Sequence, residues 1–372
     1  MRSLFLANFV QFGAKIVSFN YFRCVKTKKR ILISPLDWGI GHATRCVPII
    51  KELLKRDYEV VIGAEGRPMK LLMQEFPEVE IIRFTGYNIN YSKYLPATTS
   101  LIFQIPKIFW NIKRENKILD KIIDDYKIDG VISDSRFGLY TKKVPCVFLT
   151  HQLKIKSPFF EKYLQNLNYK FINKFNQCWI IDDEKNNLAG ELSMPKFFPE
   201  NYKYIGPLSR FENIEEEKKY DILCLISGPE PQRTIFEKGL IKAIKKRQEK
   251  TLIILGKPEQ KFSKKTSNIT IKSHLNAREL NKAIIESNFV ISRSGYSTIM
   301  DLVKLGKKAF FIPTPGQTEQ EYLARYFFER KICYYQKQEN FDLNKALNKS
   351  KSYRGFSKIE TKIEWESLFS LF

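Results

Sequence analysis

Short, almost continuously apolar runs alternate with longer stretches of helical spacing from residue 30 onward. Six apolar runs in the first half have the length and composition of buried strands: 30–34, 59–64, 79–84, 128–133, 144–150 and 178–182. Helix-like stretches such as 43–56 and 101–127 lie between them. Apolar strands separated by helices are typical of a parallel sheet that helices cover on both faces. The pattern therefore predicts a doubly wound, Rossmann-like α/β domain over residues 30–206.

The same pattern restarts in the second half of the chain. A Gly-Pro pair opens a charge-rich run there, and we interpret residues 207–220 as an interdomain linker. Five further strand-like runs follow it: 221–227, 251–256, 268–273, 288–292 and 308–313. We therefore predict a second, tandem domain of the same class over 221–335, with ligands at the carboxyl ends of strands and in the interdomain cleft. The basic, weakly periodic tail 336–372 is predicted to form surface helices.

The charge balance adds a bias toward acidic partners. The 372 residues carry 63 basic and 40 acidic side chains, a net charge of +23, which favours nucleic acid, anionic lipid or nucleotides. Residues 1–29 look like a basic leader, either a non-native extension or an amphipathic surface anchor. A signal peptide is disfavoured because the basic residues follow the apolar part. Six scattered cysteines and no long apolar segment favour a cytoplasmic protein.

The turn after the first strand, "PLDWGIGHATR" (35–45), carries the first candidate chemistry. Gly39 and Gly41 allow backbone amides to approach an anion at the start of the following helix, where the helix dipole is positive. His42 is a candidate general base; the alternative is a histidine that only caps or packs. The spacing fits neither the dinucleotide fingerprint nor a P-loop.

The stretch 289–327 repeats the order strand, glycine turn, helix. Its helix start offers hydroxyls and amides that can hold a diphosphate, from Ser294, Gly295, Ser297 and Thr298. Asp301, one turn further, can accept hydrogen bonds from two hydroxyls of a ribose or sugar, although an acid is also favourable there on electrostatic grounds alone. A polar cluster after the next strand is suited to contact sugar hydroxyls, or is a solvated helix start: Gln317, Glu319, Gln320 and Glu321.

Polar residues at two other strand ends are further candidates. Asp134 and Arg136 follow the fourth predicted strand, and His151 follows the fifth. Strand-end polar residues of α/β sheets are often functional. Asp134 can orient His42 or His151, or share a proton with either of them, whereas a structural salt link between Asp134 and Arg136 is the alternative.

Basic and aromatic residues suggest contacts with phosphate and lipid. Arg45 and Arg293 can pair with phosphate in bidentate fashion, or simply meet solvent. The stretch 104–116 mixes aromatic and basic residues on a predicted helix, which suits a membrane-facing site for a lipid-linked acceptor. Aromatic residues at such spacing also occur as core positions.

Taken together, these motifs resemble glycosyltransferase family 28, whose best-known member adds N-acetylglucosamine to a lipid-linked peptidoglycan precursor. The shared pattern in 289–327 is a strand ending in R-S-G, an acid seven residues after that serine, a second strand ending in proline, and a glutamine-rich helix start. The segment 39–45 is similar to the family's G-G-x-G-G-H loop, with Trp38 and Ile40 in place of glycines. The resemblance spans both domains and implies the GT-B fold.

The resemblance also implies roles for individual residues. His42 matches the candidate base, and the acceptor side would include Gly39, Gly41, Arg45, Arg136 and His151. In the family, a turn of the second domain contacts the donor phosphates and a later segment flanks the donor base. The matching positions here are Ser227, Gly228, His274 and Leu275. Asp301 replaces the glutamate that holds the donor ribose, Gln320 matches a glutamine that contacts the donor sugar, and Glu321 replaces a second glutamine.

The reaction implied is an inverting hexosyl transfer from a nucleotide-diphosphate sugar, with UDP as the expected nucleotide, to a hydroxyl acceptor. The acceptor would be a lipid-linked or cell-envelope glycan precursor, met at the inner face of the membrane by a peripheral enzyme. No cofactor and no tightly held metal are expected. Two alternatives stay open. A nucleotide-sugar 2-epimerase shares this fold but would usually need more histidines than the three present. A nucleic-acid-binding protein is motivated by the charge, although no known RNA- or DNA-binding module is found.

Overall fold

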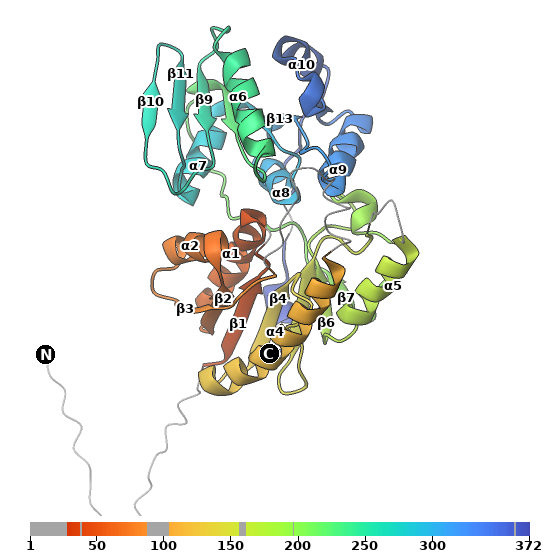
Figure 1. The fold of residues 1–372 in the computed structure, drawn as a ribbon. Coiled ribbons are helices and arrows are strands. Elements are labelled where there is room, and N and C mark those ends of the chain that lie inside the picture. Colours follow the sequence, from red (N-terminus) through yellow and green to blue (C-terminus); the bar gives the residue numbers. More distant parts are fainter. Residues whose placement is uncertain (1–27, 38, 88–103, 156–160, 196, 361) are drawn as a thin grey trace, which may run out of the picture.

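Two α/β domains follow one another along the chain (Figure 1). The computed structural model describes residues 28–37, 39–87, 104–155, 161–195, 197–360 and 362–372. Nearly all of the predicted leader 1–29 lies outside these residues, as does the first part of the helix predicted over 101–127. The predicted fold class, two doubly wound sheets in tandem, is confirmed.

The N-terminal sheet has seven parallel strands in the order β3-β2-β1-β4-β5-β6-β7. The strands are β1 (Arg30–Pro35), β2 (Glu59–Ala64), β3 (Glu80–Arg83), β4 (Gly130–Asp134), β5 (Cys146–Thr150), β6 (Gln177–Ile180) and β7 (Tyr202–Tyr204). Alternate residues of β1 face opposite sides. Ile31 and Ile33 pack toward α1 (Ile40–Lys55) and α2 (Gly66–Glu75), whereas Leu32 packs toward the opposite layer. That layer consists of α4 (Ile105–Tyr126) and α5 (Glu161–Ile172).

The C-terminal sheet also has seven strands, in the order β10-β11-β9-β8-β12-β13-β14, and only β10 runs antiparallel to its neighbour. The strands are β8 (Tyr220–Leu225), β9 (Thr251–Ile254), β10 (Ser263–Lys265), β11 (Ile269–Lys272), β12 (Ser287–Ser292), β13 (Lys308–Phe311) and β14 (Tyr334–Tyr335). One face is covered by α7 (Ala277–Ile285), α8 (Tyr296–Lys304) and α9 (Thr318–Glu329). The other is covered by α6 (Gln232–Ile244) and α10 (Leu343–Ser350).

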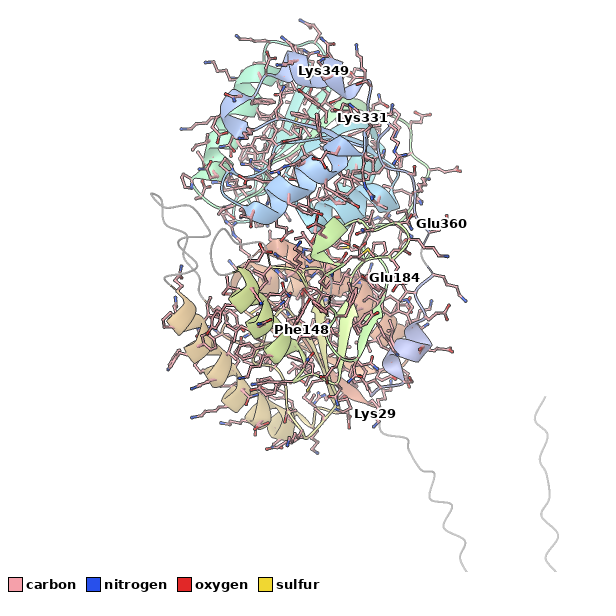
Figure 2. All side chains as sticks on the ribbon, turned by 90° about the vertical axis from the view of Figure 1, so that its right-hand side faces the viewer. Lys29, Phe148, Glu184, Lys331, Lys349 and Glu360 are labelled. Atoms are coloured by element: carbon pink, nitrogen blue, oxygen red, sulfur yellow. The ribbon has the colours of Figure 1, made fainter. Side chains whose placement is uncertain are left out.

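Two segments connect the domains. Residues 206–219 contain no helix or strand, and in this stretch Arg210 forms an ion pair with Glu75 of α2. The tail first forms α10 on the C-terminal domain and then crosses back through the segment that carries Glu360 (Figure 2). It ends in α11 (Trp365–Phe369), where Phe369 packs edge-on against Tyr58 of the N-terminal domain. In the described part of the chain, no helix is long and apolar enough to cross a membrane.

Candidate active site

The candidate site lies at the carboxyl edge of the N-terminal sheet, between β1 and β4. These strands are paired, with Pro35 beside Asp134, but the chain continues from β1 to β2 on one side of the pair and from β4 to β5 on the other. Such a point in a doubly wound sheet leaves a crevice in which ligands bind. His42 and Arg45 stand three residues apart on the first turns of α1 and therefore share one face of that helix. Both contact Asp134.

Asp134 is fully buried and takes part in a bidentate ion pair. Arg45 Nε donates to Asp134 Oδ2 at 2.8 Å, and Arg45 Nη2 donates to Oδ1. Burial alone would raise the pKa of Asp134, but the charges of Arg45 and His42 hold it well below its usual range. The alternative salt link from Asp134 to Arg136 is not formed, because Arg136 pairs with Glu115 instead.

Nδ1 of His42 lies within hydrogen-bond distance of both an acceptor, Asp134, and a donor, Arg45. His42 Nδ1 lies 3.2 Å from both Asp134 oxygens and 2.8 Å from Arg45 Nη2. A guanidinium only donates, so Nδ1 either accepts from Arg45 or donates its own proton to Asp134. Base catalysis by the outer nitrogen, Nε2, requires the second arrangement. Burial and the charge of Arg45 lower the pKa of His42, which keeps the imidazole neutral near pH 7.

His151 extends this network toward the second domain. Its Nδ1 lies 2.9 Å from Arg45 Nη1 and must accept, which places the ring proton on Nε2. That nitrogen is 3.2 Å from Glu319 Oε1 at the start of α9, without the alignment of a hydrogen bond. The ring also stacks on Tyr296, the first residue of α8, with centroids 4.3 Å apart. The Tyr296 hydroxyl donates to the carbonyl oxygen of Ile181 at 2.6 Å.

The start of α8 meets the start of α1 directly. Ser297 Oγ donates to the carbonyl oxygen of Gly41 at 3.0 Å. A Cβ at Gly41 would lie 2.8 Å from this hydroxyl, so a larger residue there would displace the Ser297 hydroxyl from its hydrogen bond. Ser294 Oγ donates to the carbonyl oxygen of Gln320 at 2.7 Å. The predicted diphosphate-binding positions therefore lie at the junction of the domains: Ser294, Gly295, Ser297 and Thr298.

Arg293 is turned into the protein and not toward this junction. It is 1% exposed, and its guanidinium donates to the carbonyl oxygens of Ile312 and Pro313 at 3.0 Å and of Gln232 at 3.1 Å. Burial lowers the pKa of Arg293 to about 10. The side chain thus holds the strand ends around the turn that begins at Ser227, whose carbonyl oxygen lies 3.4 Å from Nε.

Asp301 faces the linker. Ser209 Oγ donates to Asp301 Oδ1 at 2.6 Å. Burial raises the pKa of Asp301 to about 6, although Ser209 and Arg210 act in the opposite direction. The carboxylate is therefore partly protonated just below neutral pH, which makes any ligand that needs its ionised form sensitive to pH.

The polar cluster at the start of α9 is held by backbone amides. Gln320 Oε1 accepts from the amide of Thr314, and Glu321 Oε1 accepts from the amide of Gly316, both at 2.9 Å. Gln317 precedes the helix and accepts from the Gln320 amide group. These contacts shape the turn between β13 and α9.

The remaining predicted site residues lie in different surroundings. Arg136 is buried against the ring of Phe84, 4.3 Å from its centroid, and does not reach the Asp134 network. His274 is partly buried, and burial and the charge of Arg210 lower its pKa, whereas Leu275 belongs to the core. Gly39 caps α1, and Gly228 follows β8 with a φ of 113° that only glycine adopts readily.

Three residues of this region are not among the predicted site residues. Tyr296 contacts His151, and Ser135 Oγ lies 3.1 Å from Arg45 Nη2. Thr314 Oγ1 is buried without a hydrogen-bond partner, near Gly228 and Arg293. Its position directly after a strand is the one sequence signal for Thr314. Among the residues that the structure describes, no group of three His, Cys, Asp or Glu side chains is placed to hold a metal ion.

Comparison with known proteins assigns both halves of the chain. Residues 234–362 match the model of the glycosyltransferase family 28 C-terminal domain, and residues 29–183 match that of glycosyl transferase family 1. The chain is a glycosyltransferase with the GT-B fold, and its second half is similar to the C-terminal domain of family 28. This result favours a transferase over the alternative of a non-catalytic nucleic-acid-binding protein.

Individual relatives are also glycosyltransferases, in agreement with the two family matches. An uncharacterized glycosyltransferase of Methanosarcina mazei is 25% identical over 327 residues, covering 78% of this chain and 81% of that protein. The UDP-N-acetylglucosamine--N-acetylmuramyl-(pentapeptide) pyrophosphoryl-undecaprenol N-acetylglucosamine transferase of Finegoldia magna is 24% identical, covering 77% and 79%. The structure of the spinosyn rhamnosyltransferase SpnG, solved with thymidine diphosphate, superposes with a TM-score of 0.62 at 10% identity, covering 92% of this chain and 95% of SpnG. The last similarity supports the fold.

Proposed function

We propose that this glycosyltransferase moves a hexose, with inversion, from a nucleotide-diphosphate sugar to a hydroxyl of a lipid-linked or cell-envelope glycan precursor. The observation that carries the proposal is the position of His42. His42 stands on the first turn of α1, where buried Asp134 at the end of β4 holds its imidazole. The start of α8, where a departing diphosphate is best stabilised, lies beside it. A base and a diphosphate site on opposite sides of one junction are what direct displacement at a sugar carbon requires.

The acceptor hydroxyl gives its proton to His42 Nε2 while its oxygen bonds to the anomeric carbon of the donor. The bond from that carbon to the diphosphate oxygen breaks on the opposite face, which inverts the configuration. The leaving diphosphate carries away the electron pair and is stabilised by the backbone amides at the start of α8. The protein groups named here supply the base and the anion site without a metal or cofactor.

The identity of the donor is part of this proposal. The relative from Finegoldia magna is named for UDP-N-acetylglucosamine, and SpnG was solved with thymidine diphosphate. We propose UDP as the nucleotide, with Asp301 holding its ribose. The sugar is left open, because Asp301 and Glu321 replace two family residues of the donor site. The test is a transfer assay with a panel of nucleotide sugars and lipid-linked acceptors. Free sugar released as an epimer without acceptor would favour the epimerase alternative.

Asp301→Asn is expected to weaken nucleotide-sugar binding about tenfold to a hundredfold. The substitution removes a charged acceptor of two ribose hydroxyls, and hydrogen bonds to charged groups contribute about 1.5–3 kcal/mol. Thermal shift with UDP-sugars and TDP-sugars measures the loss and names the preferred base. Glu329→Gln, which neutralises an exposed carboxylate on α9, is the matched control and keeps the full shift. Unchanged binding by Asp301→Asn would contradict the ribose role.

Donor affinity of the unchanged enzyme is expected to fall below about pH 6. The pKa of Asp301 is raised to about 6, so the carboxylate gains a proton as the pH falls through that value and loses acceptor capacity. Binding titrations from pH 5 to pH 8 measure the effect. Nucleotide phosphates titrate in the same range, so the informative quantity is the difference between the enzyme and Asp301→Asn. A difference that does not change with pH would contradict this assignment.

The acceptor side suggests a membrane-facing helix, α4. Trp110 is 61% exposed, and Arg114 lies over its ring at 5.2 Å. Lys113, Lys117 and Ile118 follow at helical spacing and are also exposed. An exposed aromatic residue flanked by lysines suits an anionic lipid surface. We propose that α4 brings the enzyme to the inner face of the membrane as a peripheral protein.

Trp110→Ala is expected to weaken binding to vesicles with anionic lipid about tenfold. The lost burial of an aromatic ring in the headgroup region is worth more than 1.4 kcal/mol. Vesicle flotation measures the affinity, and Met73→Ala, which removes an exposed apolar side chain from α2, is the control. Equal losses for the two variants, or no loss for Trp110→Ala, would contradict a specific role of α4.

A further inference from the structure

The network around His42 contains two carboxylates and one fixed cation. Arg45 carries the positive charge, and Asp134 and Glu319 carry negative charges. With both imidazoles neutral, the cluster therefore holds one net negative charge. It becomes neutral when His42 takes up a proton, which is the state that the proposed reaction creates.

We propose that Glu319 of the donor domain is a positioning residue that stabilises protonated His42 through the His151–Arg45 contact, so that closure of the donor domain strengthens the base. This inference rests on the proposed function, because it assumes that His42 is the base. Glu319 touches neither His42 nor the reacting atoms. Its effect passes through His151, 3.2 Å away, to Arg45 Nη1, 2.9 Å further on.

Asp134 alone does not supply the negative charge that stabilises protonated His42. Both of its oxygens are engaged by the guanidinium of Arg45, so its negative charge is largely matched by that group. Glu319 is the second carboxylate of the cluster. Burial would raise the pKa of Glu319, but His151, Arg45 and His42 outweigh it and keep the pKa below its ordinary value. Glu319 is therefore ionised, and it is linked to His42 through His151 and Arg45.

A thiol and a phenol also lie near the two imidazoles. Cys46 on α1 lies 3.7 Å from Asp134, and Tyr296 on α8 stacks on His151. Burial raises the pKa of both groups well above their ordinary values. Asp182, behind the Tyr296 hydroxyl, is already bound by the Ser193 hydroxyl and by backbone amides of the loop that follows it.

Glu319 belongs to the domain that is proposed to bind the donor, so its charge reaches the base only when that domain is in contact with the N-terminal domain. It stands beside Gln320 in the first turn of α9, on the C-terminal domain, whereas His151, Arg45 and His42 belong to the N-terminal domain. Because this contact joins the two domains, their separation would break it. A base that gains strength on closure acts mainly when the donor domain is in place, which limits unproductive proton uptake in an open enzyme.

The experiment compares Glu319→Gln with Glu329→Gln, which removes the same charge from the exposed end of the same helix. The chain has three histidines, so an NMR titration of the imidazole signals can be assigned with single variants. In Glu319→Gln we expect the pKa of His42 to fall by about 0.5–1 pH unit. Turnover rises as His42 loses its proton, so the acidic limb of the kcat profile moves to lower pH by the same amount. At the plateau, a weaker base lowers kcat about threefold.

Several outcomes separate the explanations. Glu319→Asp, which keeps the charge, should restore most of the titration shift. An unchanged His42 titration in Glu319→Gln, or an equal shift in Glu329→Gln, would overturn the inference. A raised donor KM with no change in the pH profile would also overturn it and would make Glu319 a direct sugar contact. The NMR titration needs no substrate. Full turnover by His42→Gln would instead refute the proposed function, whatever the titration shows.

Discussion

Asp134→Asn is expected to lower the free energy of unfolding by about 3–5 kcal/mol and to abolish most turnover. The substitution keeps the size of the side chain but leaves the guanidinium of Arg45, which is 3% exposed, as a buried charge without its carboxylate. His42 loses the acceptor that holds its Nδ1 proton, so its outer nitrogen is no longer kept as the free base. Urea unfolding followed by circular dichroism, with transfer assays on the same samples, measures both effects.

The double variant Asp134→Asn/Arg45→Met separates charge from packing. Removing both ends of a buried ion pair is far less costly than removing one, so we expect partial recovery of stability without recovery of turnover. Additive destabilisation would show that the pair is not the source of the effect. The pH dependence gives a second check. The pKa of Asp134 is lower in the folded protein, so its contribution to stability is present above about pH 4 and is lost as the pH falls further. Asp134→Asn should flatten this part of the stability curve.

Most of the sheet architecture could be predicted from the sequence because its strands are buried on both faces. All eleven apolar runs correspond to strands of the structure. The strands that were not predicted are β7, β10 and β14, which have two or three residues each and lie at sheet edges. An edge strand contacts the core on few positions, so its sequence carries little of the apolar signal. The exposed run of β10, Ser263–Lys265, illustrates this.

The site could be predicted only where its signals are local. His42 follows a strand and a glycine turn, and Asp134 ends another predicted strand, so the sequence predicts their contact as one of two alternatives. The pairing of β1 with β4 brings the two side chains together. Arg45 was predicted to bind phosphate, yet here it pairs with Asp134. The contacts of His151 with Tyr296 and Glu319 join residues of different domains. They depend on how two domains dock, which no periodicity of the sequence encodes.

His42→Gln is expected to lower kcat by about 10²- to 10⁴-fold while the donor KM stays within about twofold, because the donor is held by the other domain. Glutamine keeps hydrogen-bonding capacity at this partly exposed position but cannot accept the acceptor proton. The melting temperature should hardly change. Lys55→Gln, at the exposed end of the same helix, is the control.

The dependence of the transfer rate on pH tests whether His42 itself is the base. The rate of the unchanged enzyme should rise with pH through the pKa of His42, which burial and Arg45 place below the ordinary value of a histidine. The residual rate of His42→Gln should lack that limb and increase only where hydroxide replaces the base. Parallel losses of kcat and donor binding would mean that His42 contacts the donor instead. A retained limb in the variant would assign the base to another group, with His151, the other imidazole bonded to Arg45, as the first to be changed.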